Sequence, residues 1–266
     1  MVAVALTIAG SDPSGGAGIQ ADLKTFHQIG VYGMSVITLL TVQNTCRVSA
    51  VEVLDAGLVE AQLLAVLEDI PPAAAKTGAL GNADVIRMVA RHAREFTFPL
   101  VVDPVMISKH GAPLIAEDAR TVLTASLLPY AALVTPNLHE AGAIAGIDVR
   151  DPESMEEAAR RILELGAAAV LVKGGHLADK AIDVLHWGGN VRHFVAERIP
   201  TIHTHGTGCT YSAAITAGLA QGLPLPEAVD VAKRFITAAI RSAPGIGAGV
   251  GPVNHHARLP SAVDAG

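Results

Sequence analysis

Cysteine, charged residues and aromatic residues are all scarce in this chain of 266 residues. Its two cysteines, Cys46 and Cys209, are too few for a disulfide framework or for a cysteine-based zinc site. Charged residues make up 17% of the sequence and aromatic residues 3%, the net charge is −6, and Lys and Arg form no block. A nucleic-acid-binding surface needs concentrated positive charge, so this composition argues against such a partner.

Long uninterrupted hydrophobic runs are also missing. Residues 199–226 contain no Asp, Glu, Lys or Arg, but His203, His205, several glycines and prolines interrupt the stretch. The opening MVAVALTIAG is apolar, yet it lacks the basic segment of a signal peptide and runs directly into SDPSGG. We therefore expect no membrane span and no signal peptide, and we expect a soluble cytoplasmic protein.

Aliphatic residues are abundant instead, in short β-branched runs that alternate with helical patterns. The predicted strands are 2–10, 34–42, 49–54, 73–80, 99–105, 132–137 and 168–175, then a hairpin of 181–187 and 191–197 around Gly-Gly-Asn. The predicted helices are 17–29, 57–69, 82–96, 117–128, 138–145, 153–165, 208–221 and 225–241. This alternation predicts a three-layer α/β/α fold, doubly wound around a mostly parallel sheet. Because no linker or repeat interrupts it, we expect a single domain over residues 1–266.

Polar side chains follow three of the predicted strands at their carboxyl ends. Asp103 ends VVD, Asn137 follows LVTP, and Lys173 with two glycines ends VLVKGG. Doubly wound sheets bind ligands beyond the carboxyl ends of their strands, so these groups are expected to face one crevice. Each alone could equally be a turn residue or a helix cap, the latter especially for Asn137.

The segment HTHGTGCTYSAAI, residues 203–215, places glycines at the start of an apolar helix. The free N–H groups of a helix start offer a site for an anion, and Thr207 adds a hydroxyl. The simpler interpretation is a flexible loop with an N-cap. Cys209 in the first turn could be a small apolar residue, or a thiol with a lowered pKa. A cysteine hydrolase with His203 or His205 as base is therefore an alternative.

Two further stretches carry groups suited to a small ligand. Gln43 ends an apolar strand, and its amide can pair with a heterocycle that presents an amino group beside a ring nitrogen; a turn contact is equally consistent. The glycine-rich loop of AGSDPSGGAGIQADLKTF leads into a helix carrying Asp22, in position to cover or contact that ligand. Asn137 and Glu140 have the spacing of a capping box, and the same pair could hold a hydrated magnesium ion.

These segments together resemble one family. LTIAGSDPSGGAGIQADLKTF, GVYGMSVITLLTVQNT, VVDPVMISKHG, TPNLHEA, VLVKGGH, THGTGCTYSAAI and GPVNH are similar to segments of the hydroxymethylpyrimidine/phosphomethylpyrimidine kinases of thiamine synthesis, in the ribokinase-like superfamily. They span residues 6–255, nearly the whole chain. The resemblance implies a ribokinase-like fold and Mg²⁺-dependent transfer of phosphate from ATP to an aminopyrimidine alcohol and then to its monophosphate. It also implies a homodimer.

The resemblance assigns roles to individual residues. The implied pyrimidine contacts are Gln43, at the aminopyrimidine edge, and Asp22, with an apolar slot made by Val42, Leu80 and Met106. The implied nucleotide and phosphate contacts are Lys173, Gly175, Asn137 and Lys233, with Asp103 and Glu140 at the magnesium. The implied anion hole is Gly206, Thr207 and Gly208, with Cys209 facing the acceptor hydroxyl.

Several expectations depend on details of this resemblance. Sugar kinases of the superfamily carry an Asp base where this chain has Cys209, so we expect the thiol to be a modest base or a positioning group. Leu80 stands where many relatives carry methionine. The loop 106–115 is the expected mobile flap. A vitamin B6 kinase, acting on pyridoxine or pyridoxal, is the alternative activity, and a regulator that has lost catalysis is a third hypothesis.

Overall fold

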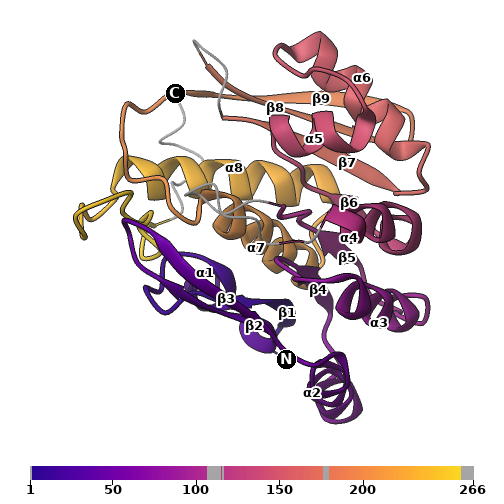
Figure 1. Cartoon of the computed structure of the whole chain (residues 1–266). Helices are drawn as coiled ribbons and strands as arrows, with labels where there is room; N and C mark the ends of the chain where they lie inside the picture. The colour runs from indigo at the N-terminus through magenta and orange to yellow at the C-terminus, as the bar shows by residue number, and fades with distance from the viewer. Residues whose placement is uncertain (1, 107–114, 116, 176–179, 259–266) are drawn as a thin grey trace.

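The computed structural model describes the chain except for residues 1, 107–114, 116, 176–179 and 259–266 (Figure 1). The described residues form one nine-stranded sheet in the order β3-β2-β1-β4-β5-β6-β7-β8-β9. The six central strands are parallel, and β3, β8 and β9 run antiparallel to their neighbours. The strands are β1 (Val4–Ser11), β2 (Tyr32–Gln43), β3 (Val48–Val53), β4 (Ala74–Thr77), β5 (Leu100–Val102), β6 (Leu133–Val134), β7 (Ala169–Gly174), β8 (Lys180–Trp187) and β9 (Asn190–Glu197).

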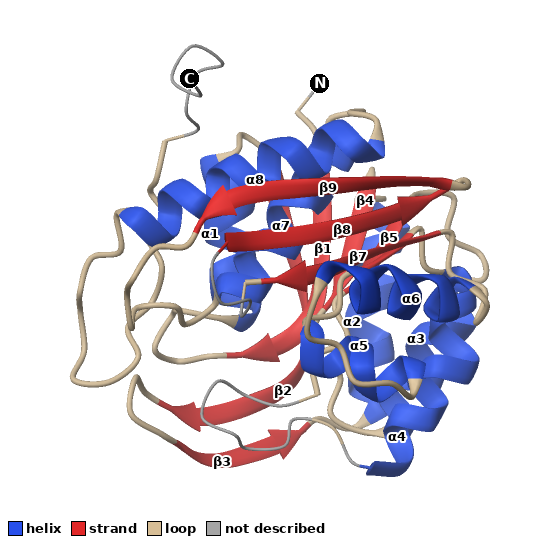
Figure 2. Ribbon diagram, turned by 90° about the horizontal axis from the view of Figure 1, so that it is seen from above, coloured by secondary structure: helices blue, strands red, loops and turns tan. Residues whose placement is uncertain are grey.

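Helices cover both faces of the sheet, as expected for a doubly wound fold (Figures 1 and 2). One layer holds α1 (Gly18–Gln28), α7 (Thr207–Ala220) and α8 (Leu225–Arg241). The other holds α2 (Ala56–Asp69), α3 (Ala83–Ala93), α4 (Glu117–Val122), α5 (Leu138–Ala145) and α6 (Pro152–Leu163). Separate clusters of buried aliphatic side chains fill the space between the sheet and each layer. No helix in the described part of the chain combines the length and hydropathy needed to cross a bilayer.

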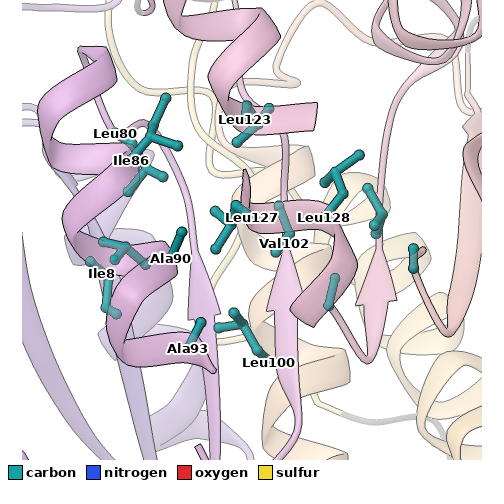
Figure 3. Close-up of a cluster of buried hydrophobic side chains, with 14 of the residues drawn as sticks. Ile8, Leu80, Ile86, Ala90, Ala93, Leu100, Val102, Leu123, Leu127 and Leu128 are labelled. Atoms are coloured by element: carbon teal, nitrogen blue, oxygen red, sulfur yellow. The ribbon is translucent and has the colours of Figure 1, made fainter. Parts of the chain in front are cut away.

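The packing of α3 illustrates how sequence pattern produces this core. Ile86 and Ala90, four residues apart, turn the same face of the helix toward the sheet, while Arg87 and Arg91 stay exposed. The buried face of α3 packs beside Ile8 of β1 in the cluster drawn in Figure 3. Burial of the aliphatic side chains on each helix therefore determines which face meets the sheet.

The predicted elements are confirmed within a few residues, with one exception. The helix expected over 117–128 continues as a π-helical turn, Leu123–Leu127, and a 3₁₀ turn, Leu128–Tyr130. Pro129 has no N–H to donate, so the α-helical ladder cannot continue through it. The predicted hairpin is also present: Trp187 pairs with Asn190 across Gly188 and Gly189, which both have positive φ.

Candidate active site

A cavity of about 830 Å³ opens beyond the carboxyl ends of the parallel strands. Its walls come from the ends of β1, β2 and β7, from the loops after β5 and β6, and from the start of α7. Asp103, Asn137, Lys173 and Gly175 all line it. The sequence-based expectation that these strand-end groups share one crevice is confirmed, because β5, β6 and β7 are neighbours in the sheet.

A largely buried ion pair lies on the wall of this cavity. Nζ of Lys173 donates to Oδ1 of Asp103 at 2.8 Å. The hydroxyl of Thr135 also donates to Oδ1, and that of Ser212 donates to Oδ2. Burial raises the pKa of Asp103, but the cations Lys173 and Lys76 outweigh it and hold this pKa below its usual value. The pair therefore places a fixed carboxylate and a fixed cation on the cavity wall.

Glu140 lies beside that pair at the start of α5. Its Oε2 accepts from the N–H of Asn137, and Oδ1 of Asn137 accepts from the N–H of Glu140, which makes the capping box the sequence suggested. Burial raises the pKa of Glu140 to about 7, even though Lys173 opposes the shift, and the negative charge of Asp103 adds to it. A carboxyl that resists ionisation beside a second carboxylate is stabilised in its charged form by an added cation.

The glycine-rich segment before α7 forms the opposite wall. Gly206 is the N-cap of α7 with a left-handed backbone, φ 78°, and the first amides of a helix have no acceptor inside it. A Cβ placed on Gly208 would lie 3.4 Å from Nζ of Lys173 and 3.8 Å from Oδ2 of Asp103. The amino end of α7 and the Lys173 ammonium thus converge on the same space, where both favour an anion.

Replacing Gly206 with alanine is expected to destabilise the fold strongly. The left-handed backbone costs an L-residue about 1–2 kcal/mol, and the new methyl group would overlap the carbonyl oxygen of Gly16. Gly222 provides the control, because it has φ 84° but open space around its Cβ position. Urea unfolding should show a much larger decrease in the free energy of unfolding for Gly206→Ala than for Gly222→Ala. Equal losses would mean that the contact with Gly16 is unimportant.

Cys209 does not have the lowered pKa expected for a thiol at a helix start. Burial raises its pKa to about 11, against the opposing effect of the Lys76 charge. The histidines proposed as its base are placed elsewhere: His205 bonds to Asp12 and Gln43, and His203 does not line the cavity. The thiol is therefore neutral near pH 7, and the geometry does not support a cysteine hydrolase.

Of the five residues expected to contact the pyrimidine, only Gln43 lines the cavity. Val42 follows the alternation of β2 onto the opposite face and is 61% exposed. Leu80 is buried in the core beside Ile86 of α3 (Figure 3). Met106 is buried and does not reach the cavity wall. The described lining therefore contains none of these three side chains, and the apolar slot stays a prediction.

Asp22 is likewise absent from the described lining of the cavity. It is fully buried, and it accepts from Nζ of Lys76 at 2.8 Å and from the hydroxyl of Thr7 at 2.6 Å. Lys76 does line the cavity, so this ion pair connects Asp22 to the cavity wall. Lys233 lines the cavity too, with its Nζ bonded to Asp183 at 2.6 Å and to the carbonyl of Ala181.

Comparison with known proteins identifies the family. The family model described as phosphomethylpyrimidine kinase matches residues 12–254. The chain belongs to this family. It is 50% identical over 262 residues to the hydroxymethylpyrimidine/phosphomethylpyrimidine kinase of Rhizobium meliloti, covering 97% of this chain and 98% of the relative.

Two more relatives extend the comparison. The chain is 52% identical over 252 residues to the thiamine biosynthesis bifunctional protein ThiED of Geobacter sulfurreducens, covering 94% of this chain and 51% of that protein. This kinase thus spans about half the length of the bifunctional relative. The crystal structure of an ADP complex of Bacillus subtilis pyridoxal kinase superposes with a TM-score of 0.90 at 42% identity, covering 97% of this chain and 98% of that one. The ribokinase-like fold expected from the sequence is confirmed.

Sequence reasoning missed three charged or polar groups of this kinase site: Lys76, Asp12 and His205 as partner of Asp12. A single lysine inside the apolar run AAAKTGAL was a signal for the first, because an isolated buried cation requires a partner. No sequence signal linked Asp12 to His205, which lies 193 residues away. Most of the loop expected as a flap, 106–115, lies outside the described residues.

Proposed function

We propose that this kinase transfers the γ-phosphoryl group of ATP to the hydroxymethyl group of 4-amino-5-hydroxymethyl-2-methylpyrimidine, and then a second one to the monophosphate, for thiamine diphosphate synthesis. The observation that carries this proposal is the set of groups that line the cavity described above. The heterocycle-pairing amide of Gln43, the anion-binding start of α7 and the Lys173–Asp103 pair all line it. A ring bearing a hydroxymethyl group can therefore contact Gln43 while its oxygen lies toward the phosphate site.

The protein mainly has to position the reactants and stabilise charge, because phosphoryl transfer leaves little covalent chemistry for the protein to do. In this proposal the amides at the start of α7, over Gly206, Thr207 and Gly208, bind the transferred phosphoryl oxygens. Lys173 neutralises negative charge on the same group, and Gly175, Asn137 and Lys233 contact the nucleotide. Cys209, in the first turn of α7, orients the acceptor hydroxyl.

We assign magnesium to Asp103 and Glu140. The donor set fits this ion, because magnesium usually keeps several waters and binds through one or two carboxylates together with phosphate oxygens. Burial raises the pKa of Glu140 to about 7 and the Asp103 charge adds to the shift, so a bound cation would favour the ionised form of Glu140. When bound, the ion would neutralise charge on the phosphates. Asn137 orients Glu140 through the capping box.

Substituting Cys209 with serine should lower kcat by no more than about tenfold, less than the loss typical of a removed general base. The reason is that a thiol with a pKa near 11 carries almost no thiolate at neutral pH. Steady-state kinetics with the aminopyrimidine alcohol measure this, and Cys46→Ser, at an exposed cysteine away from the cavity, is the control. A thousandfold loss with intact structure would show that the thiol is an essential base.

A second candidate activity is the phosphorylation of pyridoxine or pyridoxal, whose ring also bears a hydroxymethyl group. The structural similarity to a pyridoxal kinase favours including it. The test is phosphoryl transfer from Mg-ATP with products resolved by mass, offering the aminopyrimidine alcohol, its monophosphate and pyridoxine separately. Conversion of both pyrimidines to the diphosphate supports the thiamine assignment. Preference for pyridoxine would support the second candidate, and no ATP use would overturn the kinase assignment for this chain.

We further infer that the kinase is a single domain that forms a cytoplasmic homodimer and takes neither nucleic acid nor membrane as a partner. Leu40 and Val42, on the face of β2 turned away from the cavity, are 46% and 61% exposed. Neighbouring apolar side chains left in water favour association with a second copy. Sedimentation velocity should show a dimer, and a monomer at micromolar concentration would contradict this inference.

A further inference from the structure

Three buried or half-buried side chains meet at one end of the cavity from distant parts of the chain. Asp12 follows β1, Gln43 ends β2, and His205 directly precedes the N-cap of α7. Nε2 of His205 lies 2.7 Å from Oδ2 of Asp12. The side-chain amide of Gln43, with its nitrogen nearest, lies 3.1 Å from the same Nε2. All three residues line the cavity.

The proton between His205 and Asp12 belongs to the imidazole. The carboxylate of Asp12 accepts the backbone N–H groups of Ser14, Gly16 and Ala17, and also the Ser14 hydroxyl. Burial raises the pKa of Asp12, but the hydrogen bonds from His205 and Ser14 outweigh it and lower this pKa overall. An ionised carboxylate can only accept, so Nε2 of His205 carries a hydrogen and donates it to Oδ2.

This assignment restricts the amide of Gln43. A nitrogen that already carries a hydrogen cannot accept one from the NH₂ group of the amide. Turning the amide by half a rotation places its Oε1 against Nε2 of His205, where it accepts a share of the same hydrogen. The NH₂ group of Gln43 then faces the cavity, and the second lone pair of Oε1 remains available to a ligand.

We propose that the Asp12–His205 pair determines the orientation of the Gln43 amide, and that His205 is thereby a positioning residue for substrate specificity. The proposal rests on the function proposed above, and it identifies the side chains that select the pyrimidine ring. An NH₂ group held toward the cavity requires an acceptor, such as an unprotonated ring nitrogen, beside an amino group that donates to Oε1. A ring that presents a carbonyl and a ring N–H at these two positions meets the wrong orientation.

The experiment compares two ligands on three variants by calorimetry without nucleotide. The ligands are the aminopyrimidine alcohol and its 4-oxo analogue, in which a carbonyl and a ring N–H replace the amino group and ring nitrogen. The variants are His205→Leu, which removes the donor, His205→Gln, which retains an N–H donor, and His203→Leu, the control two residues away and outside the cavity lining.

The wild-type protein and His203→Leu should prefer the amino ligand. In His205→Leu the amide can turn either way, so the ratio of the two Kd values should fall by about tenfold, the value of one hydrogen bond. His205→Gln should retain most of the preference. An unchanged ratio in His205→Leu, even with weaker binding of both ligands, would overturn the proposal, because a merely structural role changes both affinities together.

The hydrogen bond from Nε2 of His205 to Oδ2 of Asp12 is tested on the wild-type protein without any ligand. Nitrogen-15 NMR of the imidazole should show a protonated Nε2 on His205, with assignment by comparison with His205→Gln. A lone pair on Nε2 would overturn the proposal, and this measurement stands if His205→Leu does not fold. If the wild type bound neither pyrimidine, the proposed function and the specificity role would both be overturned, whereas the NMR result would still decide the Asp12 contact.

Discussion

Replacing Lys173 with methionine is expected to lower kcat by about 10²- to 10³-fold, the usual loss when one fixed electrostatic contact to a transition state is removed. Lys173 is the cation that lies against both the Asp103 carboxylate and the position beside Gly208 at the start of α7. In the proposed mechanism, a phosphoryl group held there develops charge that this ammonium stabilises without prior reorganisation. Methionine fills similar volume but carries no charge, so the stabilisation disappears.

Steady-state kinetics of Lys173→Met with the aminopyrimidine alcohol measure this loss. Lys180→Met is the matched control, because Lys180 is exposed at the start of β8 and does not line the cavity. Thermal unfolding of both variants separates a loss of fold from a loss of chemistry. A kcat for Lys173→Met within a few-fold of the wild type, in a folded protein, would show that the cavity ion pair is structural and that the phosphate site lies elsewhere.

Replacing Lys76 with methionine is expected to destabilise the protein by about 3–5 kcal/mol, the cost of leaving one member of a buried ion pair without its partner. The side chains of Lys76 and Asp22 are both fully buried at 2.8 Å separation. Burial lowers the pKa of Lys76, but the charge of Asp22 and of other nearby groups outweighs this effect and raises it overall, whereas burial raises the pKa of Asp22 despite the Lys76 charge. Without that cation, the Thr7 hydroxyl is the one hydrogen-bond donor left to the Asp22 side chain among the residues that the structure describes.

Urea unfolding with a double-mutant cycle tests this prediction. Asp22→Asn combined with Lys76→Met removes both charges, and the amide oxygen of Asn can still accept from Thr7. The double variant should therefore be more stable than Lys76→Met alone. If the double variant lost as much unfolding free energy as Asp22→Asn and Lys76→Met together, the two side chains would contribute independently and the pairing energy would be negligible.

The order of secondary structure was predictable from the sequence because it depends on local patterns. Aliphatic residues at helical spacing, as in α3, and short β-branched runs determine which face is buried. Side chains that end parallel strands must gather at one edge of the sheet, so Asp103, Asn137 and Lys173 could be placed together in advance. The capping box at Asn137 was also visible in the spacing alone.

The charge states of the site residues, and the faces of the sheet toward which their side chains project, were decided only by the tertiary structure. Cys209 lies in a helix start that lowers a thiol pKa, yet burial raises it to about 11, and burial depends on every element packed around α7. Val42 and Gln43 are adjacent in sequence but lie on opposite faces of β2, and the described cavity lining includes Gln43 but not Val42.

Contacts between segments that are distant in sequence were also decided only by the tertiary structure. Asp22 meets Lys76 across 54 residues and Asp12 meets His205 across 193, and nothing local in either segment indicates the partner. Local periodicity therefore determined the architecture and the edge of the sheet where the site lies. Long-range packing decided which polar groups are desolvated, paired and aimed at the ligand, because pKa and hydrogen-bond direction depend on the surroundings in three dimensions.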